Sequence, residues 1–306
     1  MERQTMLAAI KERMPEKRYI HTIGVMETAI RLAHQYGENP QKAEIAAIFH
    51  DIAKYADVDW MKQVVIEQQF DARLLDWNAE ILHGPVGAWI VETEFQIYDE
   101  AILNAIRYHT TGRANMTTFE KIIYVADMIE PNRKFQGVEE LRMLADISLE
   151  DAFRACVTHT LSFLVSSQQA IYPVSIECYN SLIREEKTYM NETLLNITYK
   201  AIDDKRGEDI VALNMQGISL LADYFIIAEG SSERQVQAIA REIKEKAEEA
   251  GYTVRRLEGF DTARWILVDM GDVVAHIFHK DERAYYNLER LWGDAPQLDA
   301  PQMDNE

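Results

Sequence analysis

Residues 45–55 read IAAIFHDIAKY, an apolar helical run that carries His50 and Asp51 side by side. Adjacent residues on a helix point about 100° apart, so one of these two side chains should face the apolar side. A buried charge costs several kcal/mol or more unless another group pairs with it. The doublet therefore predicts either a solvated helix edge or two side chains that face a cation.

The residues around this stretch, 1–187, read as a series of helices. Apolar side chains recur three and four positions apart, as in Leu7, Ile10 and Met14, which is the period of an amphipathic helix. Prolines separate these runs, as helix boundaries require; they are Pro15, Pro40, Pro85, Pro131 and Pro173. We expect an all-α helical bundle, with no strand before residue 208.

The pattern changes after one more expected helix at 191–206. Short segments rich in branched and aromatic residues predict strands, and a charged amphipathic segment predicts a helix. That helix has a capping box at Ser232 and Gln235 and a stop at Gly251. In order, the segments are strands in DIVALNMQGIS and ADYFIIAEG, the helix SSERQVQAIAREIKEKAEEAGY, a hairpin RWILVDMGDVVAHIFH that turns at 269–272, and a closing helix KDERAYYNLERLWG.

These segments predict two folded domains and a tail. The 306 residues exceed one ordinary domain. We expect an all-helical domain at 1–187 and an α/β domain with a mixed sheet at 190–294. The boundary near 186–190 has no Gly/Ser linker, so it should be short and stiff. The acidic, proline-containing segment 295–306 is expected to be a disordered tail.

Composition restricts the partners and the compartment. The net charge is −19, and by count residues 1–189 carry −9 and residues 190–306 carry −10. Neither half is suited to grip a nucleic acid through bulk charge, and cationic or metal-bridged partners are expected. Two cysteines, no signal-peptide pattern and no long uncharged apolar run predict a cytoplasmic protein without disulfides or membrane spans.

The first domain holds a constellation of histidines and aspartates at helix ends and inside apolar runs. His21, the His50-Asp51 doublet, His83, His109 and Asp127 form this set. Neutral imidazole suits transition metals, and a carboxylate can bridge two of them. Two ions about 3.5–4 Å apart can clamp both oxygens of a phosphoryl displacement. Taken singly, each histidine is more often structural than a ligand, so the hypothesis depends on their order.

That order resembles a known family. The pattern His21, His50-Asp51, Asp127 resembles the HD-domain metal-dependent phosphohydrolases, and His83 with His109 resembles the members that hold two metals. The flanking stretches are KRYIHTIGV, AAIFHDIAKY, LHGPVGA, IRYHTTG and KIIYVADMIEPNR. Together they resemble the HD-type symmetrical bis(5′-nucleosyl)-tetraphosphatases, which cleave diadenosine tetraphosphate into two ADP.

The resemblance implies roles for these residues. It implies that His21, His50, Asp51 and Asp127 bind one metal and that His83 and His109 bind a second, with Asp51 bridging. It suggests two divalent or mixed-valence iron ions, while the ligand set alone also allows manganese, and a bridging hydroxide as nucleophile. Asp51 and Lys54 are the catalytic candidates, and Lys54, one turn after Asp51, is expected to face the substrate. Further candidates for the phosphate chain are Arg18, Arg133, Thr110 and Thr111.

Other functions remain open for this domain. A nucleoside 5′-triphosphatase or an alarmone hydrolase is the alternative within enzymes. A degenerate domain that only binds a nucleotide is the alternative outside them, and the intact ligand set disfavours it. A homodimer also remains open.

The second domain has a Gly230-Ser231 turn between a predicted strand and a predicted helix. Nucleotidyltransferases use Gly-Ser there to seat phosphate and follow it with an Asp-x-Asp metal pair. No Asp-x-Asp follows in 233–306. The pattern favours a nucleotidyltransferase-like fold and disfavours a cryptic transferase activity.

The stretches LLADYFIIAEGSSERQVQAIA, GFDTARWILVDMGDVVAHIF and AYYNLERLWGD resemble the ribosomal silencing factor family. The resemblance implies that this domain binds a large-subunit ribosomal protein and blocks subunit joining, which would repress translation. Its acidic charge should attract a basic ribosomal protein. Trp265, Tyr285 and Tyr286 are interface candidates, because aromatic anchors dominate interfaces, although single aromatics are more often core residues. The chain is therefore predicted to be a fusion of a hydrolase and a ribosome-binding domain.

Overall fold

The computed structural model describes residues 2–219 and 221–298. The chain divides into two compact units, Met1–Ile183 and Arg184–Glu306. Within the described residues, the first unit is all-helical and every strand lies in the second. The expectation that no strand precedes residue 208 is confirmed, because β1 begins at Glu208.

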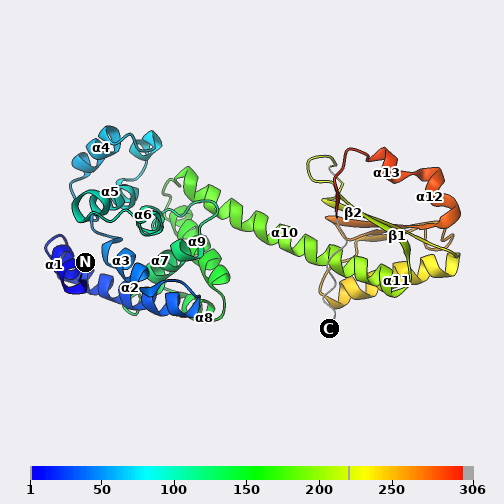
Figure 1. The fold of residues 1–306 in the computed structure, drawn as a ribbon, viewed down its shortest axis with the longest axis horizontal. Coiled ribbons are helices and arrows are strands. Elements are labelled where there is room, and N and C mark those ends of the chain that lie inside the picture. Colours follow the sequence, from blue (N-terminus) through cyan, green and yellow to red (C-terminus); the bar gives the residue numbers. More distant parts are fainter. Residues whose placement is uncertain (1, 220, 299–306) are drawn as a thin grey trace. The chain divides into compact units, whose positions relative to one another are not determined.

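Several helices of the first unit begin at capping residues that the sequence supplies. The side chain of Asn39 accepts the backbone N–H groups of Gln41 and Lys42 at the start of α3, and Thr117 forms a capping box with Glu120 in α7. The helices, shown in Figure 1, are α1 (Arg3–Lys11), α2 (Glu16–Gln35), α3 (Pro40–Phe49), α4 (Val58–Glu67), α5 (His83–Phe95), α6 (Glu100–Tyr108), α7 (Thr118–Ile129), α8 (Val138–Ile147), α9 (Leu149–Ser166) and α10 (Pro173–Asp204), with 3-10 turns at Ala72–Asp76 and Ala79–Ile81.

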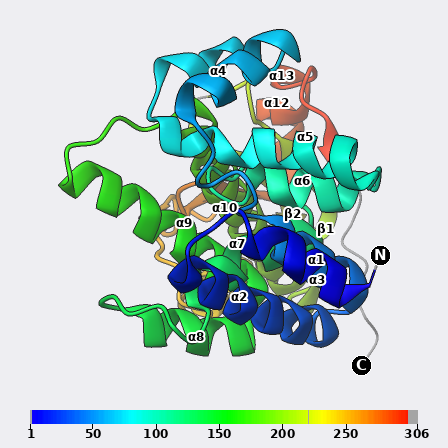
Figure 2. The same cartoon turned by 90° about the vertical axis from the view of Figure 1, so that its left-hand side faces the viewer.

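Packing in the first unit brings the ends of several helices together. Helix α2 contacts both α3 and α7, and α6 contacts both α5 and α7. Figure 2 shows α1, α2 and α3 grouped on one side of this unit and α5 beside α6. The small residues Ala43, Ala46 and Ala47 of α3 are fully buried, so neighbouring helices approach α3 closely. The residues that follow α3 and α6 therefore lie inside the unit.

The second unit contains a six-stranded mixed sheet in the order β3-β4-β5-β2-β1-β6. Strands β2 and β5 pair in parallel, while the other pairs are antiparallel. The predicted hairpin is confirmed, because β4 and β5 are neighbours joined by a turn at Gly271, whose φ is +94°. The elements are β1 (Glu208–Asn214), β2 (Tyr224–Gly230), α11 (Glu233–Glu249), β3 (Arg256–Glu258), β4 (Trp265–Asp269), β5 (Val273–His279), α12 (Lys280–Tyr286), α13 (Leu288–Leu291) and β6 (Gln297–Leu298).

Helices cover both faces of this sheet. Helix α11 and the second half of α10 lie along one face, and α12 and α13 lie on the other (Figure 1). Alternate residues of β5 point to opposite faces. Val273, Ala275 and Ile277 pack against the α11 side, while Val274 and Phe278 pack on the other side.

Three expectations for the second unit are wrong in detail. The expected helix at 191–206 is the end of the longer α10. The closing helix is interrupted at Asn287, whose φ of +45° breaks the helical path between α12 and α13. The expected tail includes strand β6, whose Leu298 pairs with Ala212 and satisfies the edge of β1. The rest of that tail, residues 299–306, lies outside the described residues.

Among residues 2–219 and 221–298, no helix combines the length and apolarity that a membrane span needs. Both cysteines, Cys156 and Cys178, are buried.

A buried histidine lies in the aromatic face of the sheet. His276 is 6% exposed, and its Nδ1 accepts the indole N–H of Trp265 at 3.2 Å. Burial lowers the pKa of His276 to about 4. An unfolded histidine has a pKa near 6.5, so between these two values the unfolded chain binds more protons. The free energy of unfolding therefore falls as the pH falls through this range.

We predict that the second unit loses about 2 kcal/mol of stability between pH 7.5 and pH 5 through His276. Hydrogen exchange of the β2 and β5 amides, corrected for intrinsic rates, measures this loss. The variant His276→Gln has no titrating ring and should reduce the pH dependence by that amount. An equally steep pH dependence in the variant would show that other groups cause it.

Candidate metal centre

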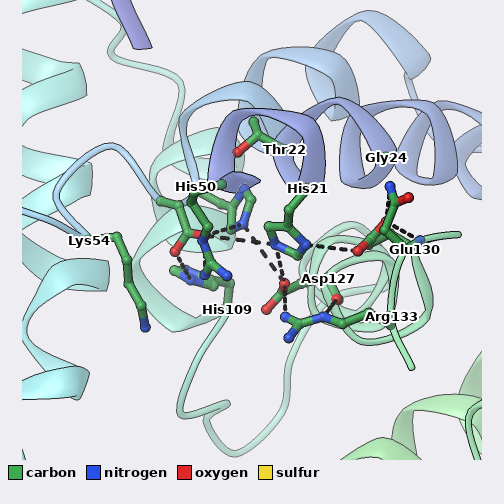
Figure 3. Close-up of polar contacts among 12 residues, drawn as sticks. His21, Thr22, Gly24, His50, Lys54, His109, Asp127, Glu130 and Arg133 are labelled. Atoms are coloured by element: carbon green, nitrogen blue, oxygen red, sulfur yellow. Dashed lines mark hydrogen bonds and ion pairs between the residues drawn. The ribbon is translucent and has the colours of Figure 1, made fainter. Parts of the chain in front are cut away.

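Six side chains converge from the ends of five helical segments of the first unit. His21 lies on α2, while His50 and His109 are the residues that end α3 and α6. His83 begins α5, Asp51 follows His50, and Asp127 lies in the last turn of α7. Figure 3 shows His21, His50, His109 and Asp127 directed toward one another. The structure thus brings together all of the residues that the sequence indicated as metal ligands.

Backbone carbonyl groups fix the orientation of three of these rings. Nδ1 of His50 lies 2.7 Å from the carbonyl oxygen of Ala47, and Nδ1 of His109 lies 2.7 Å from that of Ile106. His83 makes the same contact with the carbonyl of Glu80. Because a carbonyl oxygen only accepts, Nδ1 must carry the proton, and in the neutral ring Nε2 presents its lone pair. All three Nε2 atoms face the centre.

Glu130 orients the fourth ring, that of His21. Its Oε1 lies 3.0 Å from His21 Nδ1, and the Glu130 residue is 1% exposed. Gly24, one turn after His21, gives this carboxylate its space, since a Cβ there would collide with Glu130 Oε2. Sequence reasoning missed Glu130. The signal for it was a second carboxylate three residues after Asp127 in an apolar run.

Asp51 divides the histidines into two pairs. Its Oδ2 lies 3.0 Å from His50 Nε2 and 3.8 Å from His21 Nε2. Its Oδ1 lies 3.2 Å from His83 Nε2 and 3.7 Å from His109 Nε2. The Asp51 side chain is 0% exposed. Each carboxylate oxygen therefore faces a different pair of imidazole nitrogens.

Most of the inward-facing atoms can only accept hydrogen bonds. His83 Nε2 and His109 Nε2 face each other at 3.0 Å, and Asp127 Oδ1 lies 3.0 Å from His21 Nε2. Buried atoms without a hydrogen-bond partner include His21 Nε2, His50 Nε2 and both oxygens of Asp51. Two groups of side chains have ligand atoms close enough to share an ion, His21–His50–Asp127 and His50–Asp51–His109. The residues present therefore fit bound metal cations.

The protonation states agree with this fit. Burial alone would raise the pKa of Asp51, but the neighbouring imidazoles of His50, His109 and His83 hold it well below its usual range. Burial also opposes ionisation of Asp127, but Arg133 and His21 hold its pKa well below the usual range. Burial lowers the pKa of His83 to about 4. Both carboxylates are therefore ionised, and His83 is neutral, at neutral pH.

Three cationic side chains border the centre. Arg18 contacts Asp51 Oδ2. Arg133 donates to Asp127 Oδ1 at 2.6 Å and to the Asp127 carbonyl oxygen at 2.8 Å. Lys54 lies farther out, as Figure 3 shows, and its Nζ donates to Glu80 at 2.6 Å. All three candidates for phosphate contacts are thus placed at the rim of the cluster.

The two threonines of the candidate set face different ways. Thr110 Oγ1 lies 3.1 Å from both His83 Nε2 and His109 Nε2. The hydroxyl of Thr111 donates to the carbonyl of Gly112 at 2.9 Å, and Thr111 lines a separate cavity. Thr110 therefore belongs to the candidate metal centre, whereas the structure does not bring Thr111 to it.

Two cavities meet at the cluster. A cavity of about 220 Å³ is lined by Lys54, Thr110 and other residues of the centre. A cleft of about 1010 Å³ is lined by His21, Glu130 and four cationic residues, Lys17, Arg18, Arg133 and Lys134. Arg18 and Arg133 line both cavities. Positive side chains thus surround a local opening in an otherwise acidic chain.

Comparisons with known proteins divide the chain in a similar way. Residues 18–132 match the HD domain family, and residues 188–306 match the family described as "Ribosomal silencing factor during starvation". A symmetrical bis(5′-nucleosyl)-tetraphosphatase of Bacillus subtilis is 50% identical over 183 residues, which are 60% of this chain and 98% of that protein. The ribosomal silencing factor RsfS of the same organism is 66% identical over 111 residues, which are 36% of this chain and 94% of that protein.

A solved structure resembles the first part of the chain. It is the crystal structure of a predicted HD superfamily hydrolase involved in NAD metabolism from Clostridium acetobutylicum. The two share 37% sequence identity with a TM-score of 0.58, and the match covers 60% of this chain and 98% of that one.

We predict that Glu130→Gln weakens metal binding about 10- to 100-fold, because the partner of a ligating histidine orients the ring and raises its basicity. Metal retained against increasing concentrations of chelator, followed by elemental analysis, measures this. Glu150→Gln is the matched control, since Glu150 pairs with Lys121 at 2.7 Å at the surface. If both variants release metal at the same chelator concentration, Glu130 does not contribute to metal binding.

Proposed function

Because the chain belongs to the symmetrical bis(5′-nucleosyl)-tetraphosphatase family in its N-terminal part and to the ribosomal silencing factor family in its C-terminal part, we propose that the first unit hydrolyses diadenosine tetraphosphate to two ADP. The observation that carries this proposal is the cluster of ionised carboxylates and inward-facing imidazole nitrogens around Asp51.

The cluster suggests how two metal ions would be held. His21, His50, Asp127 and one oxygen of Asp51 would bind the first ion. His83, His109 and the other oxygen of Asp51 would bind the second. We propose iron, with manganese as the alternative that this ligand set accepts. Bound there, two such ions would supply Lewis-acid activation of a phosphoanhydride and of a water molecule.

The chain's own residues would then bind and orient the polyphosphate. Arg18 and Arg133 line both cavities, so a substrate held between them reaches into the cleft on one side and the smaller cavity on the other. Lys17 and Lys134 add charge in the cleft, and Lys54 adds charge in the cavity. Arginine and lysine hold phosphate by charge-assisted hydrogen bonds. A substrate with two phosphates on each side of the scissile bond would fill both openings, whereas a nucleoside triphosphate has only three phosphates in all.

We predict that the purified protein, loaded with iron or manganese, converts diadenosine tetraphosphate into ADP alone. Chromatographic separation of the nucleotide products tests this. Lys134→Gln should raise KM several-fold with little change in kcat, because Lys134 lines the cleft without contacting a metal ligand. The control Lys62→Gln removes a charge from α4 and should change neither constant. Formation of AMP with ATP, or faster hydrolysis of a nucleoside triphosphate or an alarmone, would contradict the proposal.

We propose that the second unit binds a basic protein of the large ribosomal subunit and thereby blocks subunit joining. The net charge of −10 on residues 190–306 supports a basic partner. An aromatic surface supports a contact site: Tyr285 is 81% exposed and Tyr286 is 43% exposed. The rings of Tyr286 and Trp265 lie 4.8 Å apart. Tyr285 and Tyr286 present large rigid rings at little entropic cost, as interface anchors do.

We also propose that the second unit has a nucleotidyltransferase-like fold but no transferase activity. The mixed sheet and the Gly230-Ser231 turn between β2 and α11 support this fold. The backbone N–H and the hydroxyl of Ser231 both donate to the side chain of Gln235 at 2.8 Å. The donors that would seat a phosphate are thus already used.

We assign the hydrolase to a domain at 1–187 and the ribosome-binding activity to a domain at 190–294. Lys187 marks the junction, since its Nζ lies 3.0 Å from Asp223 and 3.3 Å from Asp272. Lys187 and both aspartates belong to the second unit, so the residues just before position 190 pack with the second domain.

We predict that Tyr285→Ala weakens co-sedimentation with large ribosomal subunits about 5-fold or more and leaves hydrolysis unchanged, since truncating an interface anchor costs more than about 1 kcal/mol. The matched control is Tyr189→Ala, because Tyr189 is 72% exposed in the same unit but lies on α10. Equal co-sedimentation of both folded variants would exclude the α12 surface as the contact site.

A further inference from the structure

Two arginines cap the carboxyl end of α7, the helix that carries Asp127. The last carbonyl groups of a helix have no partner within it, and arginine side chains can supply one. Nε of Arg133 donates to the carbonyl oxygen of Asp127 at 2.8 Å. Arg142, on α8, donates from Nε to the carbonyl oxygen of Ile129 at 2.9 Å and from Nη2 to that of Glu130 at 2.8 Å. The end of α7 is therefore held in part by a side chain of the next helix.

Arg142 also reaches the far side of the turn that follows α7. Its Nη2 donates to the carbonyl oxygen of Arg133 at 3.2 Å. The turn is closed from within, because the N–H of Arg133 donates to the carbonyl oxygen of Glu130 at 3.0 Å and the N–H of Asn132 donates to Glu130 Oε2 at 2.7 Å. One guanidinium thus binds the backbone on both sides of Pro131, so it fixes the shape of the turn as well as capping the helix.

The turn carries the two side chains that hold ligands of one candidate ion. Glu130 Oε1 lies 3.0 Å from His21 Nδ1, and Arg133 donates to Asp127 Oδ1 at 2.6 Å. Figure 3 shows both contacts. His21 and Asp127 belong, with His50, to one of the two groups whose ligand atoms can share an ion. A change in the shape of the turn would therefore act on this group through two of its members.

Other segments orient the two histidines of the second proposed ion. Nδ1 of His83 faces the carbonyl oxygen of Glu80, and Nδ1 of His109 lies 2.7 Å from that of Ile106. These carbonyl groups belong to α6 and to the turn before α5. Loosening of the turn after α7 should therefore disturb one ion more than the other.

We propose that Arg142 is a positioning residue for the ion that His21, His50 and Asp127 would bind. It acts by holding the turn after α7, and the turn in turn places Glu130 and Arg133 on their ligands. A planar guanidinium suits this role, since its fork fixes angles as well as distances, which a lysine ammonium does not. The inference rests on the metal centre of the proposed function, but it does not depend on which substrate that centre hydrolyses.

The ion pair of Arg142 does not account for its placement. Its Nη1 pairs with Glu139, whose side chain is 78% exposed, and exposed pairs of this kind contribute little to stability. The Arg142 side chain itself is only 25% exposed, and its other contacts are all with backbone oxygens. A residue that merely stabilised the packing of α8 would affect both ions alike, whereas the proposed role affects one of them first.

The test is the release of metal from the full chain, loaded with Mn²⁺, at increasing concentrations of chelator. We expect Arg142→Gln to release one ion per chain at an about 10-fold lower chelator concentration, as loss of an outer partner of a ligand does, and to retain the other ion as the unaltered chain does. Arg142→Lys keeps the charge and part of the hydrogen bonding, so it should lie between the two. The matched control Arg31→Gln removes an arginine that binds Asp146 of the same helix α8 at 2.7 Å, and it should release both ions as the unaltered chain does.

A double variant tests the route of the effect. Because Arg142 acts in part through Glu130, the change from Arg142→Gln should be smaller in a Glu130→Gln background than in the unaltered chain. Equal loss of both ions from Arg142→Gln, release identical to that of Arg31→Gln, or fully multiplicative effects in the double variant would overturn the proposal. The proposed hydrolysis fails by a separate measurement, the analysis of nucleotide products, on which the release of metal does not depend.

Discussion

The first unit depends on one buried carboxylate, that of Asp51. Its side chain has no exposure to solvent, and each of its oxygens faces two imidazole nitrogens. An ionised carboxylate in such a place is strongly unfavourable without compensating charge. The histidines at the ends of α3 and α6 and at the start of α5 direct their Nε2 lone pairs toward Asp51. The proposed catalysis is thus a consequence of satisfying this group, while the apolar core of the unit packs the helices that carry the histidines.

The sequence predicted that the six ligand side chains lie together. It did not predict the contacts that hold them in position. His50 and Asp51 in an apolar run already required a cation or a partner, and the order of the other ligands indicated which residues would join them. The carbonyl contacts of Ala47 and Ile106 were not predictable, since any residue supplies a carbonyl. Glu130 was missed because its role depends on the packing of α2 against α7, which no local pattern specifies. Thr111 donates to the Gly112 carbonyl and lines a separate cavity, a difference from Thr110 that the Thr-Thr pair in the sequence does not indicate.

In the second unit, local patterns predicted β1, β2, the β4–β5 hairpin and α11, because alternation and capping are short-range signals, whereas the three-residue strand β3 was not predicted. The split at Asn287 and the pairing of β6 were not predicted. The first depends on a left-handed backbone position, and the second depends on a sheet edge formed by residues about 85 positions earlier. The two units have separate cores and separate candidate sites, so the proposed hydrolysis and ribosome binding each rest on their own residues.

The metal content of Asp51→Asn tests the central claim most directly. Asparagine has nearly the same shape but lacks the charge and the second carboxylate oxygen that would serve the second ion. Elemental analysis of the unaltered chain should give two metal ions per chain, and Asp51→Asn should lose both. Asp127→Asn, which alters a ligand of one ion only, should retain the ion held by His83 and His109. Retention of either ion at unaltered affinity in Asp51→Asn would contradict the account.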